Sequence, residues 1–323
     1  MITPSSSTAS FPQPPFRKIE KVEVAICTYN REKLLEKTLQ SVQKLIVPYH
    51  VSLTVILVDN NSDDRTGEIL KQFASNPAFT QRHSVRVLLE SQQGHTFARN
   101  RAVDSLDGDL LIWTDDDVDL DAFLVQRYVD FANDNREVAF FGGSIEPDFE
   151  TEPPAWILEN WEQLKGCFAT RELGPQSMSF DEDTLPYGAN FAVRSCVQKR
   201  FAFETSLGRR GEEVLGEDEL EMMRRLLQAG YAGRWVPGAS VKHFIPADRA
   251  TESYVRDYFL GQGRALVTKG EPWSDDHRAL MWRALRAYLW YRFKRRFADS
   301  KDWIPLLMEH SLAQGQSDAL KSR

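Results

Sequence analysis

The stretch "GDLLIWTDDD", residues 108–117, joins an apolar run to three consecutive carboxylates. The apolar part has the composition of a short buried strand. Asp115, Asp116 and Asp117 follow where that strand should end, and their like charges repel one another at such short range. The stretch therefore predicts one of two features: a solvated acidic turn that leads into the next element, or a site for a positively charged ligand.

The chain before this stretch alternates strand-like and helix-like patterns. Apolar runs rich in β-branched residues cover residues 21–30, 53–62 and 85–91. Helical spacing of apolar residues is found at 31–45, 63–75 and 94–106. This alternation predicts an α/β fold with a mainly parallel sheet and helices on both faces. Ligands of such sheets collect at the carboxyl ends of the strands, which is where the polar segments "CTYNR", "DNNSDD" and "TDDDVD" stand.

The composition narrows the class of protein. With 323 residues and 42% hydrophobic positions, the chain can bury a sizeable core. Its formal net charge of −7 argues against nucleic acid as a partner, because proteins that bind it usually carry a basic domain. The three cysteines are too few and too far apart for a disulfide framework or a zinc site, which favours a reducing, cytoplasmic location.

Several familiar signals are absent from the sequence. Residues 1–18 are rich in serine and proline, and we expect a disordered tail there rather than a signal peptide. No apolar run reaches the roughly 20 residues that span a bilayer. The glycine-rich patterns GxGxxG and GxxxxGK(S/T) are also missing. A nucleotide bound by this sheet must therefore be held by residues other than a glycine-rich phosphate loop.

Five sequence blocks stand in a fixed order along the chain: "VAICTYNREKLLEKTLQSV", "VILVDNNSDD", "GHTFARNRAVDSLDGDLLIWTDDD", "PYGANFAVRS" and "GEDELEMMRRLLQAGY". Together they resemble family 2 glycosyltransferases of the GT-A fold, of the bacterial polysaccharide type, over about residues 20–265. The resemblance implies a Rossmann-like catalytic domain over residues 19–250 and a helical extension over residues 251–323. It also implies a nucleotide-sugar donor and a divalent cation.

The resemblance assigns the acidic stretch to the family's DxD pattern, which holds Mn²⁺ or Mg²⁺ against the donor pyrophosphate. Both ions prefer oxygen ligands. Alternate residues of an extended segment point the same way, so we expect Asp117 to bind the metal and Asp115 the metal or the ribose, with Asp116 on the donor side. His243 stands near where some relatives carry a further metal or phosphate ligand, and a structural histidine is the alternative.

The same resemblance assigns contacts with the donor. Asp59 is expected to accept a hydrogen bond from the base, which suits N3–H of uracil and predicts a UDP-linked sugar. Arg99 is expected to donate hydrogen bonds from its guanidinium group to the base or to the phosphates. Further contacts are expected from Thr28, Tyr29, Asn30, Arg31 and Asn61. For "DNNSDD", a turn that caps a helix is the alternative.

The resemblance places the catalytic pair, Glu217 and Asp218, at the start of a predicted helix. Inverting transfer needs a carboxylate that takes the proton of the acceptor hydroxyl, and Asp218 is the expected base. Acidic residues at a helix start are favourable through the helix dipole in any case, which is the alternative. Acceptor contacts are expected from Trp156, Gly188 and Asn190, with core packing as the alternative for the tryptophan.

These expectations combine into a metal-dependent, inverting glycosyltransferase that moves one sugar to a glycan or a lipid-linked hydroxyl. Single transfer is preferred because Tyr231 in "YAGRW" stands where processive synthases need glutamine. One alternative is a sugar nucleotidyltransferase, for which the glycine-rich basic loop after the first strand is missing. The other is a non-catalytic protein that binds nucleotide sugars.

Residues 278–297 combine aromatic and basic side chains and contain no acidic residue. A helix of this composition can lie on anionic lipid. The segment therefore predicts peripheral contact at the inner face of the membrane, which would suit a lipid-linked acceptor. A helix that packs on the catalytic domain, with its basic face in solvent, is the alternative.

Overall fold

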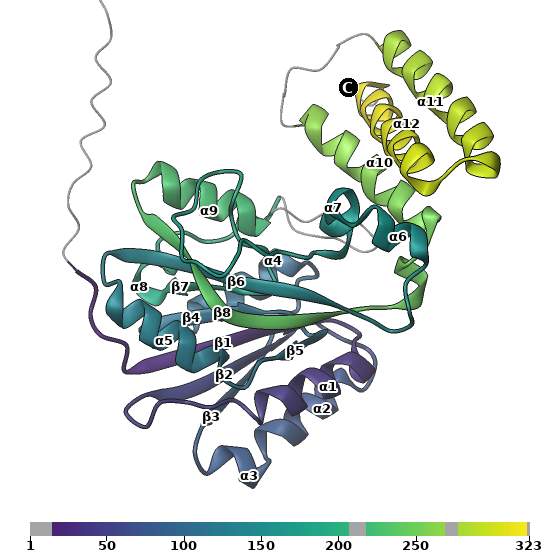
Figure 1. The fold of residues 1–323 in the computed structure, drawn as a ribbon. Coiled ribbons are helices and arrows are strands. Elements are labelled where there is room, and N and C mark those ends of the chain that lie inside the picture. Colours follow the sequence, from purple (N-terminus) through teal and green to yellow (C-terminus); the bar gives the residue numbers. More distant parts are fainter. Residues whose placement is uncertain (1–14, 207–217, 269–276, 322–323) are drawn as a thin grey trace, which may run out of the picture. The chain divides into compact units, whose positions relative to one another are not determined.

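The computed structural model describes residues 15–206, 218–268 and 277–321 (Figure 1). The chain divides into two compact units, each with its own hydrophobic core. The described residues of the first unit are 15–144, 172–206 and 218–241. The described residues of the second are 145–171, 242–268 and 277–321.

The first unit is built on a mixed sheet with the strand order β3-β2-β1-β4-β7-β6-β8-β5. Strands β3, β2, β1 and β4 are parallel neighbours, and β7 runs antiparallel to both β4 and β6. The mainly parallel α/β sheet expected from the sequence is therefore confirmed, and β6 and β8 continue into the second unit. The strands are β1 (Lys21–Thr28), β2 (Ser52–Asp59), β3 (Ser84–Leu89), β4 (Leu110–Thr114), β5 (Val118–Leu120), β6 (Val138–Phe149), β7 (Phe191–Arg194) and β8 (Ala232–Ile245).

Helices cover both faces of this sheet. On one face, Ala25 and Trp113 pack in one core cluster with Ala98 of α4. Val24 and Ile112 point to the opposite face, because side chains alternate along a strand, and they are equally buried. The helices of this unit are α1 (Glu32–Val42), α2 (Thr66–Ala74), α3 (Pro77–Thr80), α4 (His95–Asp104), α5 (Leu124–Asp134), α8 (Ser195–Gln198) and α9 (Asp218–Gln228).

The described end of the expected tail is bound to the first unit. The backbone N of Phe16 donates to the carbonyl oxygen of Arg136 at 2.8 Å, and the Arg194 guanidinium lies 4.7 Å from the Phe16 ring centroid. Ile19 is buried. Residues 1–14 of the predicted tail lie outside the described residues, so their disorder stays a prediction.

The second unit is helical, as expected for the C-terminal region. Two glycines allow α10 and α12 to approach closely: a Cβ on Gly263 would collide with the carbonyl of Leu312, and one on Gly315 with that of Leu260. Within the described residues, no helix has both the length and the apolar character to cross a membrane. The expected domain boundary after residue 250 stays a prediction. The helices are α6 (Ala155–Glu159), α7 (Trp161–Leu164), η1 (Lys165–Phe168), η2 (Ala247–Arg249), α10 (Glu252–Thr268), α11 (His277–Phe297) and α12 (Ser300–Lys321).

Candidate active site

The polar loops after β1, β2 and β3 are tied together by one residue, Asn60. Thr28 lies opposite Asp59 in the parallel register of β1 and β2, and the backbone N of Asn60 donates to the carbonyl of Thr28 at 2.9 Å. Its Nδ2 donates to the carbonyl of Gln92 at 2.7 Å, and its Oδ1 accepts from the backbone N of Gly94 at 2.9 Å. Asn60 therefore fixes the loops at the sheet edge. The sequence pattern did not single it out, although an amide directly after a strand is typical of such bridges.

Two asparagines in these loops adopt a left-handed backbone. Asn30 and Asn61 have φ values of 52° and 63°, a region that asparagine tolerates better than most residues. The backbone N of Asn30 donates to Oγ of Ser62 at 3.1 Å, and its Oδ1 accepts from the backbone N of Asp63 at 2.9 Å. Both asparagines shape the loops, and their contacts with a donor stay predictions.

The other predicted donor residues of β1 and β2 lie at the same edge. Thr28 is buried, Arg31 is half-buried and Tyr29 is exposed. Asp59 is buried, and its Oδ1 accepts from the backbone N of Ser62 at 2.9 Å. The turn considered as an alternative is thus present and engages one carboxylate oxygen of Asp59. Contact between Asp59 and a base stays a prediction.

The three consecutive carboxylates lie in the tight connection between β4 and β5. Asp116 and Asp117 are only 8% and 9% exposed, and Asp115 is half-buried, so this is not a solvated turn. Burial and the charge of Asp117 raise the pKa of Asp116 to about 7, while the charge of Arg31 acts in the opposite direction. Carboxyl groups are therefore concentrated where water is scarce and their ionisation is disfavoured, a penalty that a bound cation would relieve.

This group of carboxylates fits Mn²⁺ or Mg²⁺ by its chemistry, because both ions take oxygen ligands and keep positions for phosphate and water. Within the described parts of the chain, no three His, Cys, Asp or Glu side chains converge as a complete metal site. Asp115 and Asp117 would accordingly share the ion with oxygens of the donor.

An ion-pair cluster joins α4 to the start of α9. Nη1 of Arg99 donates to Oδ2 of Asp218 at 2.7 Å and to Oε2 of Glu219 at 3.2 Å. Nδ1 of His95 lies 3.9 Å from the same Oδ2. The side chains of Arg99, Asp218 and Glu219 are 3%, 1% and 14% exposed. The sequence placed Arg99 at the donor and did not predict this pairing; its donor contact stays a prediction.

The two carboxyl groups of this cluster have opposite pKa shifts. Burial raises the pKa of Asp218, but the charges of Arg99 and His95 outweigh burial and hold the pKa below its usual value. Burial raises the pKa of Glu219 to about 7; Arg99 opposes this rise and the charge of Asp218 adds to it. A general base works best when its pKa lies near the operating pH. Glu219, which the sequence did not single out, is therefore a second candidate for proton transfer.

Asp115 and Asp116 share one neighbourhood with this cluster at the end of β1. Burial raises the pKa of the Cys27 thiol, and the charges of Asp115, Asp116 and Asp218 add to that rise. The charge of Asp115 also stabilises the protonated form of Arg99. The structure thus brings predicted metal-binding and catalytic residues together within the first unit.

Gly188 stands directly against this cluster. A Cβ at this position would lie 2.8 Å from Nη2 of Arg99 and 3.1 Å from Oε1 of Glu219. A residue without a side chain is therefore needed here, because the guanidinium occupies the space. Its contact with an acceptor stays a prediction.

Asn190, which was expected to meet the acceptor, links strands in the core. It is fully buried, and its Nδ2 donates to the carbonyls of Ser144 and Ala239, each at 2.9 Å. Its Oδ1 accepts from the hydroxyl of Tyr128 at 2.7 Å. The amide thus bonds to β6 and β8, and its acceptor role stays a prediction.

The remaining predicted site residues belong to the second unit or lie outside the described residues. Trp156 packs against Trp303, with ring centroids 5.7 Å apart. Nδ1 of His243, which is buried, lies 3.4 Å from the carbonyl oxygen of Phe168. The acceptor role of Trp156 and the metal role of His243 stay predictions. Glu217 lies outside the described residues.

Known proteins match this chain, one of them over most of its length. The family model described as "Glycosyl transferase family 2" matches residues 23–193. A glucosyl-dolichyl phosphate glucuronosyltransferase of Haloferax volcanii is 22% identical over 284 residues, which are 86% of this chain and 88% of that protein. An undecaprenyl-phosphate 4-deoxy-4-formamido-L-arabinose transferase of Photorhabdus laumondii is 34% identical over 127 residues, and this match spans only 38% of this chain and 37% of that protein.

Solved structures share the fold. The mannosyltransferase PcManGT from Pyrobaculum calidifontis, in complex with GDP-Man and Mn²⁺, has a TM-score of 0.53 at 16% identity, over 96% of this chain and 76% of that one. S. aureus TarS 1-349 in complex with UDP has a TM-score of 0.52 at 14% identity, over 94% of this chain and 90% of that one. The GT-A fold expected from the sequence is confirmed.

Proposed function

Because the chain belongs to glycosyl transferase family 2, we propose that it moves a single sugar from a UDP-linked donor to an acceptor hydroxyl, with inversion. The observation that carries this proposal is the buried Arg99–Asp218 pair, held in the neighbourhood of Asp115 and Asp116 at the end of β1. The family match and the transferase relatives favour this enzyme over a nucleotidyltransferase or a non-catalytic binding protein.

The nucleotide is proposed to lie at the carboxyl ends of β1 and β2. Asp59 would accept N3–H of uracil there, and Arg31 would line the base and ribose. Two features support this position: the loops are already fixed by Asn60, and a structure of similar fold holds UDP. Preformed loops bind a ligand with less loss of conformational entropy.

The donor pyrophosphate is proposed to bind beside Asp115 and Asp117. A divalent cation held by these carboxylates would act as a Lewis acid and neutralise the leaving diphosphate. Support comes from the concentrated negative charge at Asp115–Asp117 and from the mannosyltransferase of the same fold, whose complex contains Mn²⁺.

Asp218 is proposed as the general base. The acceptor oxygen attacks the anomeric carbon while its proton passes to the carboxylate of Asp218. The bond between the anomeric carbon and the diphosphate oxygen breaks, and its electron pair leaves with the nucleoside diphosphate. One such displacement inverts the anomeric configuration. Arg99, bonded to Oδ2 of Asp218, orients the carboxylate for this step.

The acceptor is proposed to be a glycan or a lipid-linked hydroxyl, reached from the cytoplasmic side with peripheral contact at the inner membrane face. The names of two relatives support a lipid-linked acceptor, because they specify dolichyl and undecaprenyl phosphates.

A nucleotide panel with a metal-site variant tests the donor and metal assignments. Thermal unfolding is measured with UDP, GDP, ADP and dTDP, each with Mn²⁺ and with EDTA. We expect UDP with Mn²⁺ to stabilise the protein by about 2.7 kcal/mol at a hundredfold excess over its Kd. Asp117→Ala should lose the Mn²⁺-dependent part of this gain. Asp119→Ala, which removes an exposed carboxylate two residues away, is the matched control and should keep it.

The outcomes separate the parts of the proposal. Equal UDP affinity with Mn²⁺ and with EDTA contradicts the metal role. A response to guanine nucleotides alone contradicts the uridine assignment. If no nucleotide sugar releases its nucleoside diphosphate in the presence of metal, the chain does not use such donors.

A further inference from the structure

One side of α11 is covered by neighbouring helices. Leu280, Ala284 and Ala287 are buried, and α11 packs along α12. The ring of Tyr288 lies 5.0 Å from that of His310. This side accounts for only part of the apolar surface that α11 carries.

The opposite side of α11 carries a second row of large apolar side chains. Leu289 lies nine residues after Leu280, about two and a half turns, so the two point in opposite directions. Trp282, Leu285 and Phe293 follow the spacing of three and four residues that places them on the face of Leu289. Trp282, Leu289 and Phe293 are 71%, 60% and 59% exposed.

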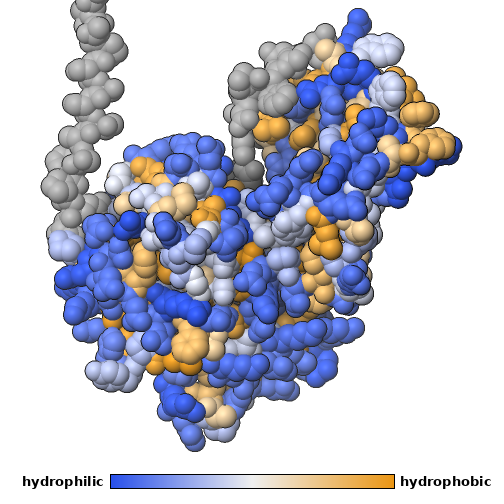
Figure 2. All heavy atoms as spheres, in the orientation of Figure 1, coloured by the Kyte–Doolittle hydropathy of each residue, from blue (hydrophilic) through white to orange (hydrophobic). Residues whose placement is uncertain are grey.

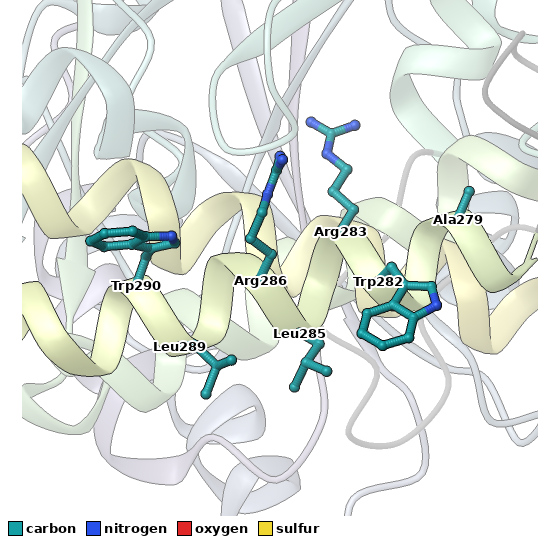
Figure 3. A pocket seen from close by; sticks show the side chains of 7 residues that line it. All are labelled: Ala279, Trp282, Arg283, Leu285, Arg286, Leu289 and Trp290. Carbon is teal, nitrogen blue, oxygen red and sulfur yellow. The ribbon is translucent and has the colours of Figure 1, made fainter.

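The figures show the same division. Figure 3 shows Trp282, Leu285 and Leu289 on one side of α11, whereas Arg283 and Arg286 extend from the other side in this view. Hydrophobic side chains are visible at the surface of the part that holds α11, among hydrophilic ones (Figure 2). The apolar face of α11, which we define as Trp282, Leu285, Leu289 and Phe293, is thus exposed among the described residues of the second unit.

Basic residues border this face on both sides. Arg286 and Arg292 stand three residues before and after Leu289, which places them about 60° to either side of it. Arg292 lies over the ring of Tyr288 at 5.9 Å, and Arg286 reaches no carboxylate of the described residues closer than the 4.0 Å contact with Glu309. Both side chains are exposed, and in Figure 3 that of Arg286 extends from the side of α11 opposite to Leu289.

Other basic residues of the helix are used inside the second unit. Arg283 is bonded to Glu309 at 2.8 Å, Lys294 to Asp302 at 3.1 Å and Arg295 to Glu252 at 2.7 Å. The basic residues of α11 therefore divide by position. Those on the covered side stabilise helix packing through these short ion pairs, whereas Arg286 has only the longer 4.0 Å contact with Glu309 among the ion pairs of the described residues, and Arg292 lies over the Tyr288 ring.

We propose that the apolar face of α11 lies in the headgroup region of a bilayer that contains anionic lipids. Apolar side chains flanked by arginine are typical of helices that lie flat in this region. Tryptophan and arginine suit the boundary, because each has an apolar body and a polar end. A second copy of the chain is a poorer partner, since a symmetric contact through this face would bring the arginines that border it near the same basic residues of the other copy.

The proposal names the surface that makes the membrane contact suggested under the proposed function. It rests on that function only for the reason why the protein would need a membrane, which is a lipid-linked acceptor. Full-length protein is sedimented with phosphatidylcholine vesicles that contain either no or about 30% phosphatidylglycerol. We expect binding to the anionic vesicles at low salt and much weaker binding at about 500 mM salt, because exposed charges are screened.

Two double variants separate the apolar and basic contributions. Trp282→Ser with Leu289→Ser should lower the partition coefficient at least tenfold. Arg286→Gln with Arg292→Gln should lower it about thirtyfold on anionic vesicles and leave binding to neutral ones unchanged. The matched control is Tyr49→Ser, which removes a fully exposed aromatic ring from the first unit and should bind as wild type.

Unfolding curves must show that each variant is folded. The proposal is wrong if folded wild type ignores anionic vesicles at low salt, or if the variants bind as wild type. It is also wrong if sedimentation velocity shows a dimer that the Trp282→Ser, Leu289→Ser variant separates. Stabilisation by UDP and Mn²⁺ is measured on the same samples. Loss of vesicle binding with intact nucleotide binding would reject the membrane proposal alone. Vesicle binding without any nucleotide binding would reject the proposed function alone.

Discussion

Arg99 and Arg292 carry the same guanidinium in opposite surroundings. Arg99 is buried, bonds to two carboxylates and lies 5.7 Å from the ring centroid of Trp113. Arg292 is exposed on α11, beside the ring of Tyr288. In the first case the charge is part of a fixed geometry that sets the pKa of its neighbours. In the second it remains available to a partner outside the chain.

This difference predicts where a substitution acts. A buried ion pair cannot lose one member without leaving an uncompensated charge in a place with little water. An exposed cation near a surface loses little stability when it is replaced, because water already solvates it. Substitutions at the buried cluster of the first unit should therefore change stability and turnover, whereas substitutions on the exposed side of α11 should change membrane binding.

The largest expected effect is on turnover in Asp218→Asn. The amide keeps the shape of the side chain but cannot take a proton, so kcat should fall by about 10² to 10⁴. Donor affinity should stay close to wild type. Steady-state kinetics with the donor identified in the nucleotide panel provide the measurement, and NMR of the product gives its anomeric configuration. Retention of the donor configuration would contradict the single displacement.

Glu219→Gln is the matched control for this assignment, and the pH profile discriminates further. A base must be deprotonated to act, so its activity is lost as the pH falls through its pKa. If Asp218 is the base, its depressed pKa keeps kcat constant from neutral to mildly acidic pH. If Glu219 is the base, kcat should fall below pH about 7, and Glu219→Gln should be the more damaging variant.

The next effect tests the two arginines directly. Arg99→Met should lower the free energy of unfolding by about 3 to 5 kcal/mol, because Asp218 and Glu219 lose their partner in a buried place. Arg292→Gln should change it by less than about 0.5 kcal/mol. Urea denaturation at neutral pH measures both. Similar losses in the two variants would mean that the contrast in burial has no energetic consequence.

A smaller effect is expected from Gly188→Ala. The added Cβ lies 2.8 Å from Nη2 of Arg99, so the guanidinium must shift, which should cost about 1 to 3 kcal/mol of stability and lower kcat. Gly166→Ala is the control, because its Cβ would meet only the Tyr258 hydroxyl, at 3.6 Å. Unchanged kinetics in Gly188→Ala would show that the position of Arg99 does not matter for catalysis.

The strand and helix pattern, the carboxylate cluster and the family could all be predicted from the sequence. These features are local: side-chain alternation, helical spacing and polar residues after a strand depend on neighbours in the chain. The loops after β1 and β2 were placed correctly for the same reason. The sequence alone could not decide whether Asp116 lies in a solvated turn, because burial depends on what packs around the residue in the folded protein.

The pairing of Arg99 with Asp218 was decided only by the tertiary structure. The two residues are 119 positions apart, and they meet because α4 and α9 pack on the same face of the sheet. The raised pKa of Glu219 has the same origin, since it depends on burial beside those charges. On α11 the sequence by itself determined a run of basic and aromatic residues. Which of them face α12 and which face water followed only from packing, because one helix cannot specify the side that its neighbour covers.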